Sequence, residues 1–406
     1  MKDTHKALAF ALTSRIIIIA VVLISSFLFA GLGFQGLAAQ FVNAHQIAKM
    51  PFVNLFFRWD SGWYLNIAQN GYPTGVPPAT YSDFTVKHVP ATVYPEYAFF
   101  PLYPAIMRAL NIIFLPFLQD IQTLTLIGII VSYTAFFVSV YFLYKLTLKL
   151  FNPQVALVST VFYSFWVGGV YFSSIYSEAL FMALALASFY FLEEKRVYLA
   201  TFLGFLAAFT RSDGFLVAVP FFVYSIQNLI SKGDKRQSTK LLISSGVVAS
   251  AFLWWGAVCF FMEGNFFAQF VARNIYWGIN PNVLAQLLAP YYFPSFSSLV
   301  FRFTVICVLL TALPVFYFIA RCKKIFTSEA RTLPYWAFGA SILYLIFTDS
   351  YVFSVARYAV AVLPLFWVSA KIYIKSRVAG IILFTVMTAL LIVGAYLFET
   401  SSWYFL

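Results

Sequence analysis

The sequence of 406 residues contains little charge. Only 10% of its residues are Asp, Glu, Lys or Arg, whereas 62% are hydrophobic and the mean hydropathy is +0.85. Soluble domains carry about 25% charged and about 45–50% apolar residues, so this composition excludes a water-soluble globule, a disordered chain and a fibrous protein. A membrane-spanning helix takes about 20 residues. We therefore predict an integral membrane protein with room for about ten helices and one large loop.

Cysteine and histidine are also scarce, with three residues of each. Cys259, Cys307 and Cys322 lie in or at the ends of apolar runs without CxxC spacing, which favours packing over a disulfide or a metal site. The histidines are scattered, so no metal cluster is expected. No GxxxxGK[ST] loop, GxGxxG loop or DxD pair occurs, which argues against nucleotide and metal-diphosphate sites. We expect any activated donor to come from the membrane, and a polyprenyl phosphate fits.

Apolar runs divide the chain into about eleven predicted spans. Two of them, 179–193 and 197–212, are shorter than a bilayer and are expected to be tilted, kinked or half-inserted. The first run lacks a convincing cleavage site, so we interpret it as the first helix rather than a signal peptide. The runs cover residues 14–32, 122–143, 154–172, 179–193, 197–212, 214–230, 241–262, 297–320, 333–348, 357–373 and 379–398.

Basic residues alternate between the loops that join these runs. With the N-terminus in the cytoplasm, 18 of the 26 Lys and Arg residues, Arg15 among them, fall on the inner side, as the positive-inside rule describes. Six of the other eight are arginines, whose planar guanidinium suits phosphate and carboxylate. The net charge of +12 therefore indicates orientation rather than nucleic-acid binding. Any chemistry is expected on the outer face.

The longest stretch without a predicted span is the first outer loop, residues 33–121, within what we treat as one transmembrane domain. Loops of this length are usually functional. Apolar and aromatic residues recur at helical spacing from Phe52 to Ile67, which predicts an amphipathic helix over 52–70 lying in the membrane interface. Residues 98–117 are expected to form a bent, partly inserted segment.

Ionisable residues on the outer side fall in a few motifs. Asp60 lies in RWDSGWY, where it either caps a helix or acts as a base in an aromatic pocket. Arg58 either pairs with Asp60 or binds phosphate. Glu178 begins an apolar helix, so helix capping is the alternative to a functional role. Arg211 and Asp213 interrupt an apolar stretch, where they form either a functional site or a solvated loop tip.

A fourth motif, FTDSYVFSVARYAVAVLPLFW, covers residues 347–367. Asp349 and the pair Arg357 and Tyr358 flank an outer loop, and Pro364 is expected to kink the next helix. An arginine at this place is suited to holding a lipid phosphate.

Several of these motifs, taken in order, resemble one known family. RWDSGWYLNIAQNGY at 58–72, AFFPLYP with Arg108, YSEALF and TRSDGFL resemble the GPI mannosyltransferase 2 (PIG-V) family of GT-C membrane glycosyltransferases. ARYAVAVLPLF at 356–366 is similar to the C-terminal Arg-Tyr and proline element of that family. The outer loops contain no N-x-[ST] sequon, which favours a prokaryotic homologue in the cell membrane.

The resemblance implies an all-helical GT-C enzyme that moves mannose from a dolichyl- or polyprenyl-phosphate donor to a glycolipid acceptor at the outer or luminal face. Asp60 occupies the position of the family's essential acidic residue and is expected to be the base of an inverting, metal-independent transfer without a cofactor. A protein O-mannosyltransferase of the same fold and a lipid-linked sugar flippase are the alternatives. The residues expected to bind the donor phosphate are Arg58, Arg211, Arg357 and Tyr358. The residues expected to contact substrate are Trp59, Ser61, Trp63, Tyr64, Glu96, Tyr103, Glu178 and Asp213.

Overall fold

The computed structural model describes residues 2–28, 55–84, 89–114, 117, 120–278, 299–348 and 354–399, and these contain helices and no strand. Five of the helices are long and apolar enough to cross a membrane, or six if the bent pair described below counts as one span. They are α1 (Lys2–Leu28), α6 (Ile121–Leu150), α11 (Lys235–Glu263), α14 (Leu299–Phe326) and α18 (Arg377–Glu399).

The remaining helices are shorter. The 16 residues of α8 or α15 extend over about 24 Å, less than the roughly 30 Å of a bilayer core. The α-helices are α4 (Asp60–Asn70), α5 (Leu102–Phe114), α7 (Pro153–Ser164), α8 (Glu178–Glu193), α9 (Val197–Ala208), α10 (Ala218–Ile230), α12 (Ala268–Trp277), α15 (Leu333–Thr348), α16 (Val355–Tyr358) and α17 (Leu363–Lys375). The 3-10 segments are η2 (Ala79–Phe84), η4 (Pro95–Ala98), η5 (Val167–Phe172), η6 (Gly214–Val217), η8 (Ala330–Thr332) and η9 (Ala359–Ala361).

A described helix falls within each of the eleven apolar runs, yet the predicted number of eleven spans is not confirmed. The chain breaks several runs before they reach membrane length. Residues Val355–Ala361 and Leu363–Lys375 illustrate this, because their axes meet at 84°. Pro364 lies at the start of α17, as expected for the residue that ends the preceding helix.

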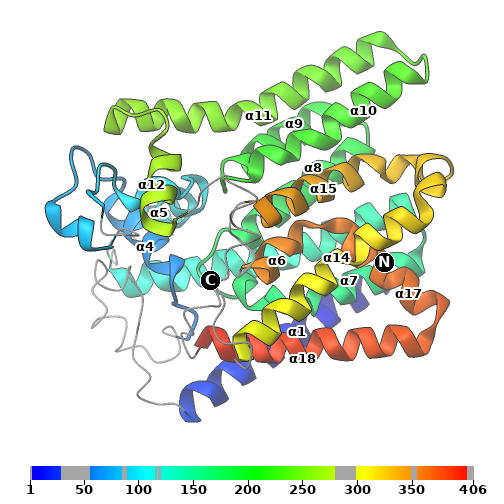
Figure 1. The fold of residues 1–406 in the computed structure, drawn as a ribbon, viewed down its shortest axis with the longest axis horizontal. Helices are drawn as coiled ribbons and strands as arrows, with labels where there is room; N and C mark the ends of the chain where they lie inside the picture. Colours follow the sequence, from blue (N-terminus) through cyan, green and yellow to red (C-terminus); the bar gives the residue numbers. More distant parts are fainter. Residues whose placement is uncertain are drawn as a thin grey trace.

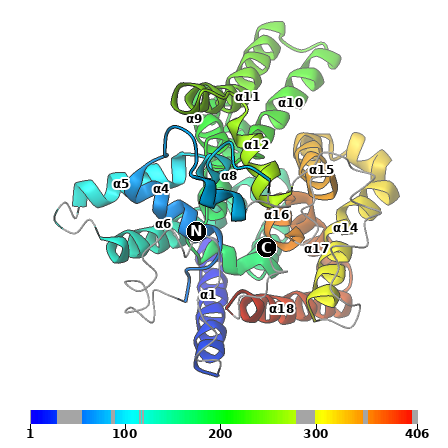
Figure 2. The same ribbon diagram turned by 60° about the vertical axis from the view of Figure 1, so that its left-hand side comes forward.

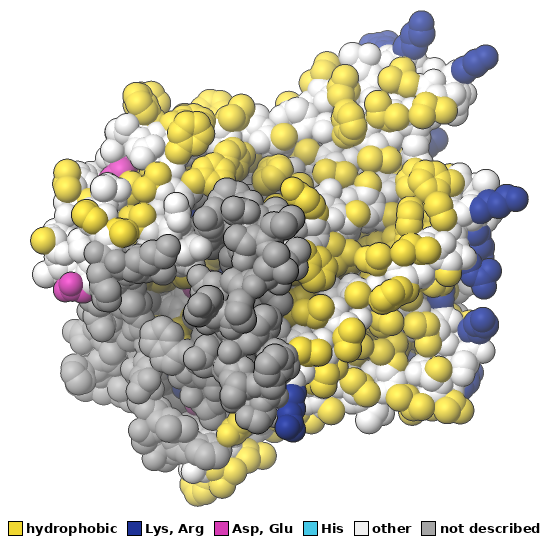
Figure 3. All heavy atoms as spheres, in the orientation of Figure 1, with side chains coloured by type: hydrophobic (Ala, Val, Ile, Leu, Met, Phe, Trp, Pro, Cys, Tyr) yellow, Lys and Arg dark blue, Asp and Glu magenta, His cyan; other side chains and the backbone are white. Residues whose placement is uncertain are grey.

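The helices form a bundle whose two ends are built from different segments (Figure 1). The N-terminus and the turns that join α10 to α11, α14 to α15 and α17 to α18 lie at one end, whereas α4, α5 and α12 gather at the other. On the face that Figure 3 shows, Lys and Arg side chains cluster at the end with these turns. The separation of charge therefore follows the alternation found in the sequence.

The helix predicted over 52–70 differs from the observed one. Phe52 lies outside the described residues, Phe56 and Trp59 precede the helix, and α4 begins only at Asp60. A backbone turn at Trp59, where φ is 50°, interrupts the helical path. Trp63 is only 3% exposed and packs in the core. The helix is thus shorter than predicted and packs its aromatic side chains against protein, while its place in the membrane interface stays a prediction.

Arg15 was also assigned wrongly, because it lies inside α1 and not in an inner loop. Its side chain is only 1% exposed. The guanidinium donates hydrogen bonds to the carbonyl oxygens of Gly169 (2.6 Å) and Ser164 (3.1 Å) and to Ser173 Oγ (3.0 Å). These acceptors belong to the irregular segment around η5, where carbonyl groups are not all used within a helix. Arg15 thus stabilises a break between α7 and α8.

The same segment fixes the position of α16. Trp166 Nε1 donates a hydrogen bond to the carbonyl oxygen of Ala356 (2.6 Å), the residue before Arg357. A Cβ atom at Gly168 would lie 2.2 Å from that same oxygen. Glycine is therefore required at 168 because two backbone segments approach each other closely there.

We expect Gly168→Ala to destabilise the protein by about 1–3 kcal/mol or more, because the added methyl group must displace the backbone that carries Arg357. The measurement is the melting temperature in detergent. Gly246→Ala on α11 is the matched control, since its Cβ would meet no atom within 4 Å. An unchanged melting temperature for Gly168→Ala would contradict the close packing of these segments.

Candidate active site

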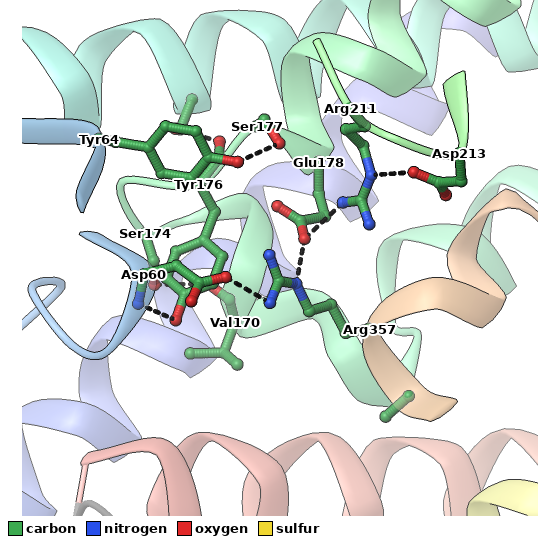
Figure 4. Close-up of polar contacts among 12 residues, drawn as sticks. Asp60, Tyr64, Val170, Ser174, Tyr176, Ser177, Glu178, Arg211, Asp213 and Arg357 are labelled. Carbon is green, nitrogen blue, oxygen red and sulfur yellow. Dashed lines mark hydrogen bonds and ion pairs between the residues drawn. The ribbon is translucent and has the colours of Figure 1, made fainter. Parts of the chain in front are cut away.

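Five buried ionisable side chains form a continuous ion-pair network, which we define as Asp60, Arg357, Glu178, Arg211 and Asp213 (Figure 4). Arg357 Nη1 lies 2.6 Å from Asp60 Oδ2, and its Nε contacts Glu178 Oε1. Arg211 Nη1 lies 2.5 Å from the same Glu178 oxygen, and its Nε lies 2.9 Å from Asp213 Oδ1. The network joins α4, α16, α8 and the segment between α9 and η6.

Alternating charges make this network possible in the interior of the bundle. A buried charge without a counter-charge costs several kcal/mol, and here each guanidinium contacts two carboxylates. The three carboxylates outnumber the two guanidiniums within the network. When all five groups are ionised, the network therefore carries one excess negative charge.

The backbone before Asp60 is strained. Trp59 has φ 50° and ψ −113°, the conformation of the first central residue of a type II′ turn, which normally takes glycine. The Ser61 N–H donates to the Arg58 carbonyl (3.1 Å) and closes this turn. Asp60 then starts α4, where the helix dipole favours a carboxylate. Such strain, of order 1–3 kcal/mol, is typical of functional sites.

The structure shows the surroundings of three of these residues, and their functional roles stay predictions. Glu178 is the first residue of α8 and only 1% exposed, and it bridges two guanidiniums instead of facing solvent at the helix end. Arg211 and Asp213 are buried and paired, so they do not form a solvated loop tip.

Tyrosine rings surround the two arginines. The Arg357 guanidinium carbon lies 4.7 Å from the ring centre of Tyr176 and 5.6 Å from that of Tyr171, and Arg211 lies 4.8 Å from the ring of Tyr358. Cation–π contacts of this kind stabilise a desolvated cation. Tyr358 was singled out from the sequence, whereas Tyr171 and Tyr176 were not, although Tyr176 begins the YSEALF motif that contains Glu178.

Other residues predicted to contact substrate lie buried around α4. The Tyr64 hydroxyl is hydrogen bonded to Ser177 Oγ (2.8 Å), and the Tyr103 hydroxyl to Ser132 Oγ (2.8 Å). The Tyr103 ring packs edge-on against Tyr64. Three more of the predicted substrate-contact residues lie in the same region. Trp63 stacks on Phe99, Ser61 Oγ accepts a hydrogen bond from the Arg58 N–H, and Trp59 directly precedes Asp60. These contacts hold α4 in place beneath Asp60.

Arg58 does not pair with Asp60. Its Nη2 lies 2.8 Å from Glu399 Oε1, and its Nε donates to the Glu399 carbonyl oxygen (3.3 Å). Arg58 therefore ties the start of α4 to the end of α18. This pair could not be predicted from the sequence, because Arg58 and Glu399 are far apart along the chain.

Glu96 lies in η4, apart from the ion-pair network. It is 1% exposed, and its Oε1 accepts a hydrogen bond from Asn66 Nδ2 (2.8 Å). Its Oε2 has no hydrogen-bond partner in the part of the chain that the structure describes. Burial raises the pKa of Glu96 to about 7, against a weaker opposing effect of the Asn66 hydrogen bond.

Among the described residues, no group of three or more His, Cys, Asp or Glu side chains is arranged to hold a metal ion. Metal-independent chemistry stays a prediction from the sequence.

Comparison with known proteins identifies a family to which the chain is similar. A family model for mannosyltransferase (PIG-V) matches residues 5–273. The chain is similar to GPI mannosyltransferase 2 of Schizosaccharomyces pombe, with 28% identity over 193 residues. That match covers 47% of this chain and 36% of the yeast protein, so the chain matches about a third of the length of this curated relative.

Solved structures give a weaker likeness. The Archaeoglobus fulgidus oligosaccharyltransferase in its apo form aligns with a TM-score of 0.43 and 11% identity, over 96% of this chain and 55% of that one. The archaeal oligosaccharyltransferase AglB of the same organism, in complex with an inhibitory peptide and a dolichol-phosphate, aligns with a TM-score of 0.42 and 11% identity. This alignment covers 84% of this chain and 54% of that one. Neither overlay is close enough to carry an argument.

The raised pKa of Glu96 predicts a pH-dependent stability. The folded state binds this proton more tightly than the unfolded state, whose glutamate titrates near pH 4.3. The contribution of Glu96 is therefore fully present below about pH 4.3 and is lost as the pH rises through about 7. The loss amounts to about 3 kcal/mol.

Melting temperatures between pH 4 and 8 test this. The melting temperature of Glu96→Gln should be equal to or lower than that of the wild type at low pH, and higher than that of the wild type above pH 7. Asp83→Asn, an exposed carboxylate of the same loop, is the control. Parallel pH profiles for the wild type and Glu96→Gln would exclude the effect.

Proposed function

The chain belongs to the mannosyltransferase (PIG-V) family, and from this premise we propose that it transfers mannose from a polyprenyl-phosphate donor to a hydroxyl group of a glycolipid or lipid-linked acceptor. The observation that carries the proposal is the buried carboxylate of Asp60, held by Arg357 at the strained start of α4. The similarity to a GPI mannosyltransferase 2 supports a glycolipid acceptor.

Asp60 acts as the general base in this proposal. An acceptor hydroxyl attacks the anomeric carbon of mannose from the face opposite the phosphate and gives its proton to the Asp60 carboxylate. The new carbon–oxygen bond forms as the bond to the phosphate oxygen breaks, and the lipid phosphate leaves with the electron pair. The configuration at the anomeric carbon is inverted, and no co-reactant is needed.

Arg357 supports this step by holding the base. Its ion pair with Oδ2 fixes the direction of the Asp60 carboxylate. Glu178 holds Arg357 from the other side and is itself held by Arg211. The base is thus oriented by groups from three other parts of the chain, as a general base requires.

The sequence led us to expect the donor phosphate at Arg211 and Arg357. Each of these guanidiniums already contacts two carboxylates. A phosphate bound there must displace a carboxylate or join a network that already has excess negative charge. We therefore assign both arginines to positioning the carboxylates and look for the phosphate site elsewhere.

The direction in the membrane follows from the charge distribution. We place the end with the clustered Lys and Arg side chains in the cytoplasm, in accordance with the positive-inside rule. The N-terminus is then cytoplasmic and Asp60 is at the outer or luminal end, where a lipid-linked donor is delivered. We propose a cell membrane of a prokaryote as the location.

We expect Asp60→Asn to reduce mannosyl transfer by about 10²–10⁴-fold, because the amide cannot accept the proton. Donor binding should persist, since the side-chain volume is nearly unchanged. The assay incubates the purified protein with radiolabelled polyprenyl-phosphate mannose and a membrane lipid extract, and follows label in a new lipid.

Asp83→Asn is the matched control, because Asp83 is an exposed carboxylate of the same loop. Near wild-type turnover by Asp60→Asn would exclude Asp60 as the base. Label in protein rather than lipid would indicate a protein O-mannosyltransferase. Movement of the donor across vesicles without transfer would indicate a flippase.

A further inference from the structure

A cavity of about 960 Å³ lies beside the ion-pair network. It is lined by residues from α11, α12 and α15 together with Asp213 and Tyr358. In Figure 2, α12 follows the end of α11 and points toward α16. The volume of the cavity is at the upper end of the range of roughly 300–1,000 Å³ that is typical of small-molecule sites.

The helices that line the cavity contribute side chains of different polarity. α11 and α15 contribute mainly apolar side chains, such as Leu253, Ile342 and Ile346. α12 contributes the polar side chains of Gln269, Arg273 and Asn274. Because α12 lies with α4 and α5 at the end opposite the N-terminus, an elongated amphiphile can place its head at α12 and its chain along α11 and α15.

Gln269 gives a second, independent indication of a ligand. It is 3% exposed, and its Nε2 has no hydrogen-bond partner among the described residues. A buried donor without an acceptor costs about 1–3 kcal/mol, which a ligand oxygen in the cavity would recover.

Arg273 supplies a cation one helical turn from Gln269, since residues four apart lie on the same face of a helix. Its charge also acts on the Tyr358 hydroxyl, so it lies close to the ion-pair network. Asp213, which also lines the cavity, contacts Arg211. The cavity thus presents the guanidinium of Arg273 and the unpartnered amide of Gln269 to a ligand.

From this arrangement we infer that the cavity is the binding site of the polyprenyl-phosphate donor, with the phosphate at Arg273 and Gln269 and the isoprenoid chain between α11 and α15. The inference rests on the proposed function and adds the place of the donor. The phosphate then lies at the Asp213 end of the ion-pair network, and Asp60 lies at the opposite end (Figure 4).

The test is a binding titration on the full chain purified in detergent, with a polyprenyl phosphate that carries no sugar. Polyprenol, inorganic phosphate and a phosphatidic acid are the comparison probes. Arg273→Gln should weaken polyprenyl phosphate binding by about tenfold and leave polyprenol binding unchanged. Arg108→Gln, which changes an exposed arginine of α5, is the control and should bind as the wild type.

A second variant tests where the isoprenoid chain of the donor binds. Gly246 lines the cavity, and a Cβ there would meet no atom within 4 Å. Gly246→Leu should therefore fold normally, extend into the cavity and weaken both polyprenyl phosphate and polyprenol. Phosphatidic acid should bind more weakly than polyprenyl phosphate, and inorganic phosphate should bind most weakly.

The outcomes separate the two proposals. If polyprenyl phosphate binds the wild type but Arg273→Gln and Gly246→Leu bind it equally well, the cavity is not the donor site. Phosphatidic acid binding as tightly as polyprenyl phosphate would also overturn the assignment. If the wild type binds no polyprenyl phosphate, the donor class of the proposed function is wrong.

Discussion

The contact of Arg357 with Asp60 and Glu178 is the interaction on which the rest of the site depends. A guanidinium in the interior of an apolar bundle needs carboxylates or other hydrogen-bond acceptors beside it, and Arg357 has two carboxylates. Asp60 comes from the first outer loop, Glu178 from the start of α8, and Arg357 from a short helix between two bent segments. One arginine therefore brings three distant parts of the chain together.

The irregular backbone of this protein serves that contact. Membrane-spanning segments avoid unpaired backbone groups unless other groups in the protein satisfy them. Arg15 satisfies carbonyl oxygens near η5, and Trp166 satisfies the carbonyl of Ala356. The breaks after α7 and before α17 are stable for this reason, and they allow Glu178 and Arg357 to meet at the interior end of short helices.

Much of the fold and part of the site were predictable from the sequence. Apolar runs report helices directly, and a helix lies within each predicted run. Asp60, Glu178, Arg211, Asp213 and Arg357 were predictable because charge is rare and costly in an apolar chain. Their union in one network was not, since pairing between distant segments leaves no local pattern.

Several other features could not be predicted from the sequence, because they depend on backbone conformation or on tertiary packing. The start of α4 depends on a positive φ at Trp59, a residue type that rarely adopts it. Arg15 matched an inner-loop residue by position, and only packing shows that it lies within α1. Arg58 and Glu399 meet through tertiary structure alone. Arg273 lies outside the sequence motifs described above, and its place in the cavity comes from the packing of α12.

The most direct test of the central claim is a double-mutant cycle between Asp60→Asn and Arg357→Gln, measured as the free energy of unfolding in detergent. If the two side chains form one buried ion pair, the double variant should be less destabilised than the sum of the single variants by about 1–3 kcal/mol. Additive losses would show that Asp60 and Arg357 act independently and would contradict the account.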